Sequence, residues 1–463
     1  VLFLALTIVL AIFGLVIASV FKNYPQAIFP CLIQIPLAVI IGVTIHRKGA
    51  NILIPSLVSL ALMYLTVAFG DIGSLGNFNE YLGGDPSNPD SNGLSVISWV
   101  MLLLGYSYIA SVLPVWTLLQ PRDYINSLQL LSALGLVVLG LIAACFFGGA
   151  ALTPGAERPA LEIVAPAFNF SPEGAPSIFP FLFITIACGA ISGFHCLVSS
   201  GTTSKQLKCE SDAQLVGYGS MLTEGFLAVL VILACISGLG LGTGTGESFI
   251  SGSAAFEARY ASWDAAKGLG AKVGAFVEGS ANFLKSLGLP AKFSIALMGV
   301  FVASFAATTL DTACRLQRYV VQELAGTLAP RHRVNGKRTG EFVSGNPLFW
   351  LTNRHAATLF AITIAFFIAQ LPGGEGKAPG TGGLLLWPLF GAINQLLAGL
   401  AFLVITFWLR RRGLPYSLAL IPGILMLVLP AIAMSLNLRD FADNNSWLLF
   451  GFGFTTIIIE VWM

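Results

Sequence analysis

The sequence predicts an all-α protein, a polytopic bundle of transmembrane helices. Of the 463 residues, 56% are hydrophobic and only 10% are charged, whereas globular domains have about 45–50% apolar and about 25% charged residues. The apolar residues also gather in long runs, and a helix needs roughly 20 such residues to cross the hydrocarbon core of a bilayer. A soluble enzyme and a disordered chain are therefore excluded.

Twelve apolar runs follow one another along the chain. Each is expected to be one membrane-spanning helix, because backbone polar groups inside lipid must be satisfied within the segment. Together they form one expected transmembrane domain over residues 1–463. The runs lie near 1–21, 26–45, 51–70, 96–119, 128–147, 178–198, 214–240, 293–313, 356–372, 383–409, 415–436 and 446–463.

The charges of the connecting loops predict the orientation, because short loops rich in Lys and Arg stay in the cytoplasm. The acidic loop 71–94 has no Lys or Arg and is expected outside the cytoplasm, as is the long loop 241–290. The basic loop 326–355 is expected in the cytoplasm, on the same side as Val1. In loop 241–290, apolar residues at helical spacing predict short helices on the outer surface, which form either a lid or a packed cap.

Composition and motifs argue against several classes of function. The charges of the 24 Lys and Arg nearly cancel those of the 22 Asp and Glu, so nucleic acid is not an expected partner. The expected partner is the lipid bilayer. The seven cysteines show no metal-binding spacing, and neither a metal nor another cofactor is expected. The sequence has no GxSxG, HExxH or P-loop motif, so the protein is predicted not to be an enzyme.

Glu224 is the clearest ionisable group within an apolar run. It lies in the segment Tyr218-Gly-Ser-Met-Leu-Thr-Glu-Gly-Phe226, with no Lys or Arg close in sequence. An ionisable group at membrane depth costs about 2.5–3.5 kcal/mol on insertion scales. We therefore expect Glu224 either to carry a coupled proton or to be a protonated group that hydrogen-bonds a neighbouring helix.

A second candidate site lies where an apolar run ends in small and hydroxyl residues, in Ser192-Gly-Phe-His-Cys-Leu-Val-Ser-Ser-Gly-Thr-Thr203. Unwound backbone in a membrane is tolerated only where it lines a cavity, so this segment is predicted to be a broken helix that binds substrate. His195 alone is either part of this site or a structural hydrogen-bonding residue. The predicted substrate-binding residues are Ser192, Gly193, His195, Ser199, Ser200, Gly201, Thr202 and Thr203.

A third group lies in Thr308-Thr-Leu-Asp-Thr-Ala-Cys-Arg-Leu-Gln-Arg318, at the cytoplasmic end of its run. Asp311 stands four residues before Arg315, an arrangement that favours an ion pair along one helix face. This pair is either a structural tie or a gate. If an ion site exists here, we expect Thr308, Thr309 and Asp311 to form it.

The fourth run ends at the segment Gln120-Pro-Arg-Asp-Tyr124, again on the cytoplasmic side. Arg122 and Asp123 suit an interfacial anchor or a gate, and the anchor is the preferred interpretation.

A fifth motif, Leu386-Trp-Pro-Leu-Phe-Gly-Ala-Ile-Asn-Gln-Leu-Leu-Ala-Gly399, places Asn394 and Gln395 inside an apolar run. Amides there usually join helices by hydrogen bonds. The proline and glycine of the same motif mark a kink that could instead line a pathway.

Four of these motifs, in this order, resemble the signatures of the carbon starvation protein A family. They are the segments that begin at Gln120, Ser192, Thr308 and Leu386. The resemblance runs from about residue 1 to the end of the chain. That family comprises multi-pass transporters of the bacterial inner membrane for peptides and, in some members, for pyruvate with protons, grouped with LeuT-like inverted-repeat transporters.

The resemblance implies uptake of a small organic nutrient by alternating access, linked to carbon starvation. The coupling ion, a proton or Na⁺, is left open, as is the oligomeric state. Helix-end amides and hydroxyls near the segment 192–203 would hold the carboxylate that pyruvate and peptides share. Glu224 would carry the coupled proton.

One departure from the family concerns the start of the chain. Family members begin with further spans, including a His-His-Phe segment followed by Gly-Ala-Gly-Pro, and nothing here corresponds to them. The resemblance thus implies an N-terminally incomplete copy. The alternatives to a transporter are a channel, a sensory membrane protein without active transport, and an intramembrane enzyme.

Overall fold

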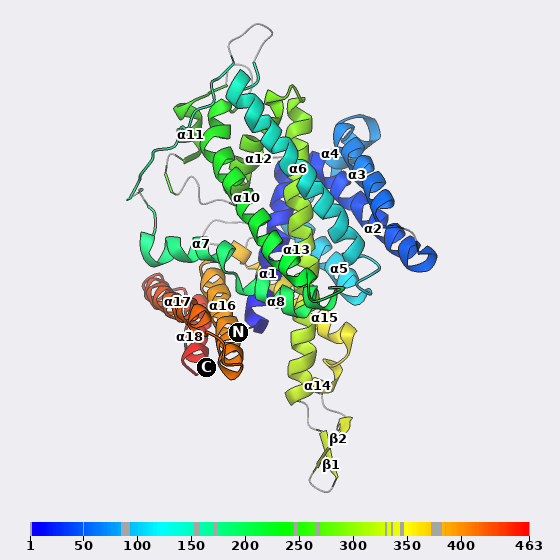
Figure 1. The fold of residues 1–463 in the computed structure, drawn as a ribbon, viewed down its shortest axis with the longest axis vertical. Helices are drawn as coiled ribbons and strands as arrows, with labels where there is room; N and C mark the ends of the chain where they lie inside the picture. Colours follow the sequence, from blue (N-terminus) through cyan, green and yellow to red (C-terminus); the bar gives the residue numbers. More distant parts are fainter. Residues whose placement is uncertain are drawn as a thin grey trace.

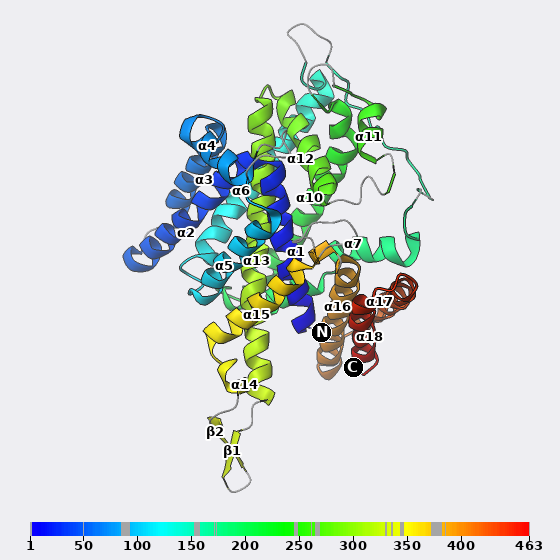
Figure 2. The same cartoon turned by 180° about the vertical axis from the view of Figure 1, so that it is seen from behind.

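A computed structural model of the chain is helical over most of the described residues. Figures 1 and 2 show an elongated bundle, in which α13 and its neighbours follow the long axis and a small β-hairpin lies at one end. The hairpin consists of the antiparallel strands β1 (Arg331–Val334) and β2 (Lys337–Phe342). The structure describes residues 2–49, 51–84, 93–151, 158–170, 172, 174–244, 249–260, 262–263, 269–328, 331–334, 337–342, 347–371, 382–384 and 386–462.

Each of the twelve predicted apolar runs coincides with a helix or a series of helices. Within the described ranges, eight are long and apolar enough to cross a membrane, and a ninth is reached if α3 and α4, which are bent by 80°, count as one span. A multi-pass helical bundle is therefore confirmed, while the count of twelve spans stays a prediction. The unbroken long helices are α1 (Leu2–Asn23), α2 (Ile28–Lys48), α6 (Leu119–Phe147), α13 (Ala291–Leu328), α16 (Trp387–Arg411) and α17 (Ser417–Asp443).

The remaining apolar helices are short or bent. They are α3 (Leu53–Ala68), α4 (Gly73–Gly83), α5 (Val96–Val112), α15 (Arg354–Gln370) and α18 (Trp447–Trp462). Helix α4 occupies part of the predicted acidic loop 71–94, and the predicted basic loop 326–355 contains the end of α13, the hairpin and α14 (Pro347–Trp350). Both segments are thus partly structured rather than simple loops.

Three of the eight spans are series of helices, and in the first of them, Pro25–Arg47, the short η1 (Pro25–Ala27) precedes α2. The span Ile178–Lys205 contains η2 (Ile178–Leu182), α7 (Phe183–Ala190), α8 (Gly193–Gly201) and η3 (Thr203–Lys205). The span Asp212–Leu241 contains α9 (Asp212–Gln214), η4 (Leu215–Gly219), α10 (Ser220–Leu233), η5 (Ala234–Gly238) and η6 (Leu239–Leu241).

Helices α1 and α13 form the centre of the bundle (Figures 1 and 2). Their most apolar stretches are 72% and 67% buried, more than those of the other spans. Both facing surfaces carry many small residues, such as Ala11 and Ala18 on α1 and Ala303 and Ala307 on α13, all buried. Small residues allow helix backbones to approach closely, and close packing is the main source of helix association in lipid.

The C-terminal helices α16, α17 and α18 form a separate group on one side of this centre (Figure 1). They share an apolar cluster with the first turns of α1, in which Ile8 and Ile12 of α1 meet Leu389 and Ile393 of α16 and Met434 of α17. The N-terminal helix therefore joins the C-terminal group to the rest of the bundle.

The predicted outer helices of loop 241–290 exist as α11 (Ser253–Tyr260) and α12 (Leu269–Ser286). Their expected surface position is wrong for α12, which packs between α6, α13 and η5. Val277 and Phe283 of α12 are fully buried, and a Cβ on Gly140 of α6 would lie 2.6 Å from the Phe283 carbonyl carbon. Apolar side chains at helical spacing did indicate the helix, but the glycines that allow this close contact lie in other segments of the sequence.

Candidate functional site

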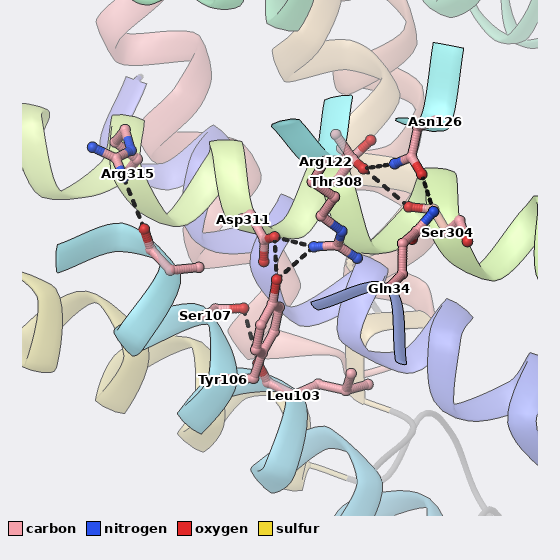
Figure 3. Close-up of polar contacts among 12 residues, drawn as sticks. Gln34, Leu103, Tyr106, Ser107, Arg122, Asn126, Ser304, Thr308, Asp311 and Arg315 are labelled. Atoms are coloured by element: carbon pink, nitrogen blue, oxygen red, sulfur yellow. Dashed lines mark hydrogen bonds and ion pairs between the residues drawn. The ribbon is translucent and has the colours of Figure 1, made fainter. Parts of the chain in front are cut away.

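The most polar part of the buried interior is an ion pair between α6 and α13. Arg122, in the first turn of α6, donates through Nη1 to Oδ2 of Asp311 in the middle of α13. Both side chains are 2% exposed. Tyr106 of α5 completes the group: its hydroxyl donates to Asp311 Oδ2 at 2.7 Å and accepts from Arg122 Nη1 at 2.6 Å (Figure 3).

A row of neutral polar side chains extends from this pair, one turn along the same helices. Asn126, four residues after Arg122, donates to the hydroxyl of Thr308, three residues before Asp311. Gln34 of α2 donates to Asn126 Oδ1 at 2.7 Å, so α2, α6 and α13 are joined (Figure 3). Hydrogen bonds between helices satisfy polar groups that would otherwise be unpaired in an apolar setting.

The cluster nevertheless keeps spare hydrogen-bonding capacity. Among the described residues, Asp311 Oδ1, Arg122 Nε and Gln34 Oε1 are buried atoms without a hydrogen-bond partner. Most buried polar atoms in proteins have a partner, so orphaned atoms that lie together in one cluster require an explanation. They mark this cluster as a place where a proton or a polar ligand would find donors and acceptors.

Two expectations about these charges were wrong. Asp311 does not pair with Arg315; instead Arg315 Nη2 donates to the carbonyls of Ala110 at 2.8 Å and Leu113 at 2.6 Å. Those carbonyls lie at the end of α5, where backbone acceptors have no partner within the helix. Arg122 is not an interfacial anchor, because its side chain is buried, whereas Asp123 beside it is exposed.

Residues 193–201 of the predicted segment 192–203 form the helix α8, contrary to the expectation of an unwound stretch. The break falls just before α8, at Ile191 and Ser192, both with non-helical backbone angles. His195 is exposed. The hydroxyls of Ser199, Ser200 and Thr202 donate to carbonyls three or four residues back in the same helix, Gly201 contacts Leu316, and Thr203 starts η3.

Asn394 of α16 holds the start of α8. Its Oδ1 accepts from the Phe194 N–H at 2.8 Å, and its side chain exchanges hydrogen bonds with the Ser192 hydroxyl at 3.1–3.3 Å. Asn394 thereby supplies a cap from a different helix. The neighbouring Gln395 is 1% exposed, and neither of its amide atoms has a partner within the described ranges.

Replacing Asn394 by leucine should therefore destabilise the fold by about 1–3 kcal/mol, because it leaves the buried Phe194 N–H and Ser192 hydroxyl unsatisfied. Thermal unfolding in detergent, followed by tryptophan fluorescence, measures the effect. Gln395→Leu is the matched control and should change the unfolding temperature little. Equal losses in the two variants would show that the hydrogen bonds of Asn394 do not support α8.

The other predicted residues lie outside the buried cluster. Glu224 is on the exposed side of α10, which packs on α6 through Leu227 and Leu230. Thr309 is partly buried, and its hydroxyl donates to the Phe305 carbonyl at 3.1 Å. Of the residues predicted to form an ion site or a gate, the structure thus brings together Arg122, Asp311 and Thr308.

Sequence reasoning missed Tyr106, Gln34 and Asn126. A signal for Asn126 was present, because an amide four residues after a buried arginine lies on the same helix face. Nothing in the sequence around Gln34 or Tyr106 indicates that they face α6 and α13, because that contact depends on how the helices pack.

Comparison with known proteins places this chain in a family. The family described as "Carbon starvation protein CstA" matches residues 1–434. Similar curated proteins include the "Peptide transporter CstA" of Mycobacterium tuberculosis (strain ATCC 25618 / H37Rv), 31% identical over 91% of this chain and 55% of that protein. Another is the "Peptide transporter CstA" of Helicobacter pylori (strain ATCC 700392 / 26695), 30% identical over 93% of this chain and 62% of that protein.

The "Pyruvate/proton symporter BtsT" of Escherichia coli (strain K12) is 28% identical over 94% of this chain and 63% of that protein. The chain thus spans about 55–63% of the length of these relatives. No solved structure matches it. On the family match, which covers all the elements of the buried cluster, the chain belongs to the carbon starvation protein CstA family.

Proposed function

We propose that the chain is the core of a secondary transporter that takes up peptides or pyruvate with protons across the bacterial inner membrane. The observation that carries the proposal is the buried Arg122–Asp311 pair with its orphaned atoms. Charged groups inside a helical membrane bundle are costly, and they mark ion and substrate pathways. The names of the relatives, peptide transporter and pyruvate/proton symporter, support the same function.

The finer architecture belongs to the same proposal. We infer twelve spans in this chain and an inverted-repeat arrangement of the LeuT type, in which broken helices flank the substrate. The break before α8 supports this arrangement. Loops 71–94 and 241–290 are placed outside the cytoplasm and loop 326–355 inside it, on the grounds of their charge.

Uptake into proteoliposomes tests the function, with the full-length protein and labelled pyruvate or labelled dialanine. A transporter should accumulate one or both substrates saturably when an inward proton gradient is imposed, and a protonophore should abolish the accumulation. A channel would give flux without saturation. Failure of both substrates to accumulate under a proton gradient would refute the proposed function.

A further inference from the structure

The Arg122–Asp311 ion pair leaves hydrogen-bonding atoms of both side chains without a partner among the described residues. A buried ion pair gains little net stability unless further hydrogen bonds satisfy both ions. Here the guanidinium reaches Asp311 through Nη1, and Nε and Asp311 Oδ1 are both orphaned. In a two-point fork of the kind that arginine forms with carboxylates, two nitrogens would be engaged. Arg122 therefore keeps the donors with which it can hold a second carboxylate.

Resting on the function proposed above, we propose that Arg122 is the anchor for the carboxylate of the substrate and that Asp311 competes for it. When Asp311 takes up a proton, its attraction for the guanidinium falls and Arg122 is free to bind the carboxylate. The net charge of the pair goes from zero to +1 on protonation and back to zero on substrate binding. One proton and one carboxylate are thereby taken up together, and no bond other than the O–H of Asp311 forms.

The neighbouring residues suit the rest of such a substrate. Asn126, Thr308 and Gln34 lie one turn from the pair and offer neutral donors and acceptors, including the orphaned Gln34 Oε1. Pyruvate has a keto oxygen on the carbon beside its carboxylate, and a peptide has an amide N–H on the corresponding carbon. Acceptors and donors in this row would pair with either group, so the shared chemistry of the ligand is a carboxylate with a hydrogen-bonding group on the neighbouring carbon.

The pH dependence expected from Asp311 must be distinguished from that of other ionisable groups near the pair. Of these, His355 is a histidine whose Nδ1 bonds the Tyr108 hydroxyl at 2.9 Å. The ionisable groups on the surrounding helices include Cys31 on α2, Tyr106 and Tyr108 on α5, Asp123 and Tyr124 on α6, Cys314, Arg315 and Arg318 on α13, and His355 on α15.

Proton counting on the full-length wild-type protein tests the proposal without any mutation. In weakly buffered detergent solution near neutral pH, saturating pyruvate or dialanine should cause net uptake of about one proton per molecule bound, and Kd should rise about tenfold per pH unit where Asp311 is ionised. The same result is expected for His355→Gln. Binding without proton uptake, or a pH dependence that disappears in His355→Gln, would overturn the proposal.

Two variants assign the roles. Asp311→Asn should bind carboxylate substrates with a Kd independent of pH and exchange them across the membrane, but lose gradient-driven accumulation. Arg122→Gln should lose binding of pyruvate while pyruvamide, which lacks the carboxylate, binds both proteins equally weakly. Arg315→Gln, which removes a similarly buried arginine without a carboxylate partner, should keep the proton coupling.

The outcomes separate this inference from the proposed function. If the wild-type protein accumulates substrate under a proton gradient and Asp311→Asn does so equally, the function stands and the role of Asp311 is refuted. If the wild-type protein accumulates neither substrate, the function itself fails. Should Asp311→Asn not fold, the wild-type proton count decides.

Discussion

Replacing Asp311 by leucine should destabilise the folded protein by about 3–5 kcal/mol, the cost of leaving a buried charge without its partner. In this variant Arg122, 2% exposed, would keep its charge without a counter-ion, because Tyr106 offers it only a neutral hydroxyl. Thermal unfolding of the full-length protein in detergent measures the loss, and transport assays on the same preparation would fail with it.

The double variant Arg122→Met/Asp311→Leu provides the control. Apolar side chains of similar volume in place of a buried ion pair are often neutral or stabilising, so the double variant should recover most of the stability while it transports nothing. If the double variant were as unstable as the single one, the pair would hold the bundle together, and a role in binding would not be needed to explain its presence.

A large effect is also expected where α12 lies against α6. Gly140→Val should destabilise the fold by about 3 kcal/mol, because the added atoms meet the backbone of Phe283 and not the end of a flexible side chain. A Cβ at this position lies 2.6 Å from the carbonyl carbon of Phe283 and 3.1 Å from its Cβ. The two helices would have to move apart, which the thermal unfolding temperature and the yield of monodisperse protein both detect.

Gly135→Val is the matched control on the same helix. A Cβ at Gly135 has no heavy atom within 4 Å, and the residue is exposed. Both variants change helix propensity alike, so the difference between them isolates the close contact. Equal stability of the two variants would show that α6 and α12 are not packed as described.

Local composition was enough to predict the helices but not how they pack. Whether a segment is apolar enough to form a membrane helix depends on the residues of that segment alone, and all twelve apolar runs therefore coincide with helices. The surface position expected for α12 was wrong because its partner α6 is distant in sequence. The break predicted for residues 192–203 lies at the very start of that segment, at Ile191 and Ser192, because Asn394 of a distant helix caps α8 at Phe194.

The candidate site shows the same limit. Asp311 and Arg315 have the spacing of an ion pair along one helix. Instead, Asp311 pairs with Arg122, 189 positions away, and Arg315 donates to the backbone carbonyls at the end of α5. Spacing rules describe isolated helices, in which these competitors are absent. Arg122, Asp311 and Thr308 were singled out from sequence, but their burial together and their partners Tyr106, Gln34 and Asn126 were not.

Helix α12 has a consequence for the order in which the protein is assembled. It is not among the helices apolar enough to cross a membrane by themselves, and its buried Ser280 and Asn282 weaken its own tendency to enter lipid. A segment of this kind does not leave the translocon sideways on its own hydropathy. Its partners α6 and η5 precede it in the chain, and its third partner, α13, follows it. During synthesis α12 can therefore pack first on α6 and η5, and its burial is completed only when α13 has been made.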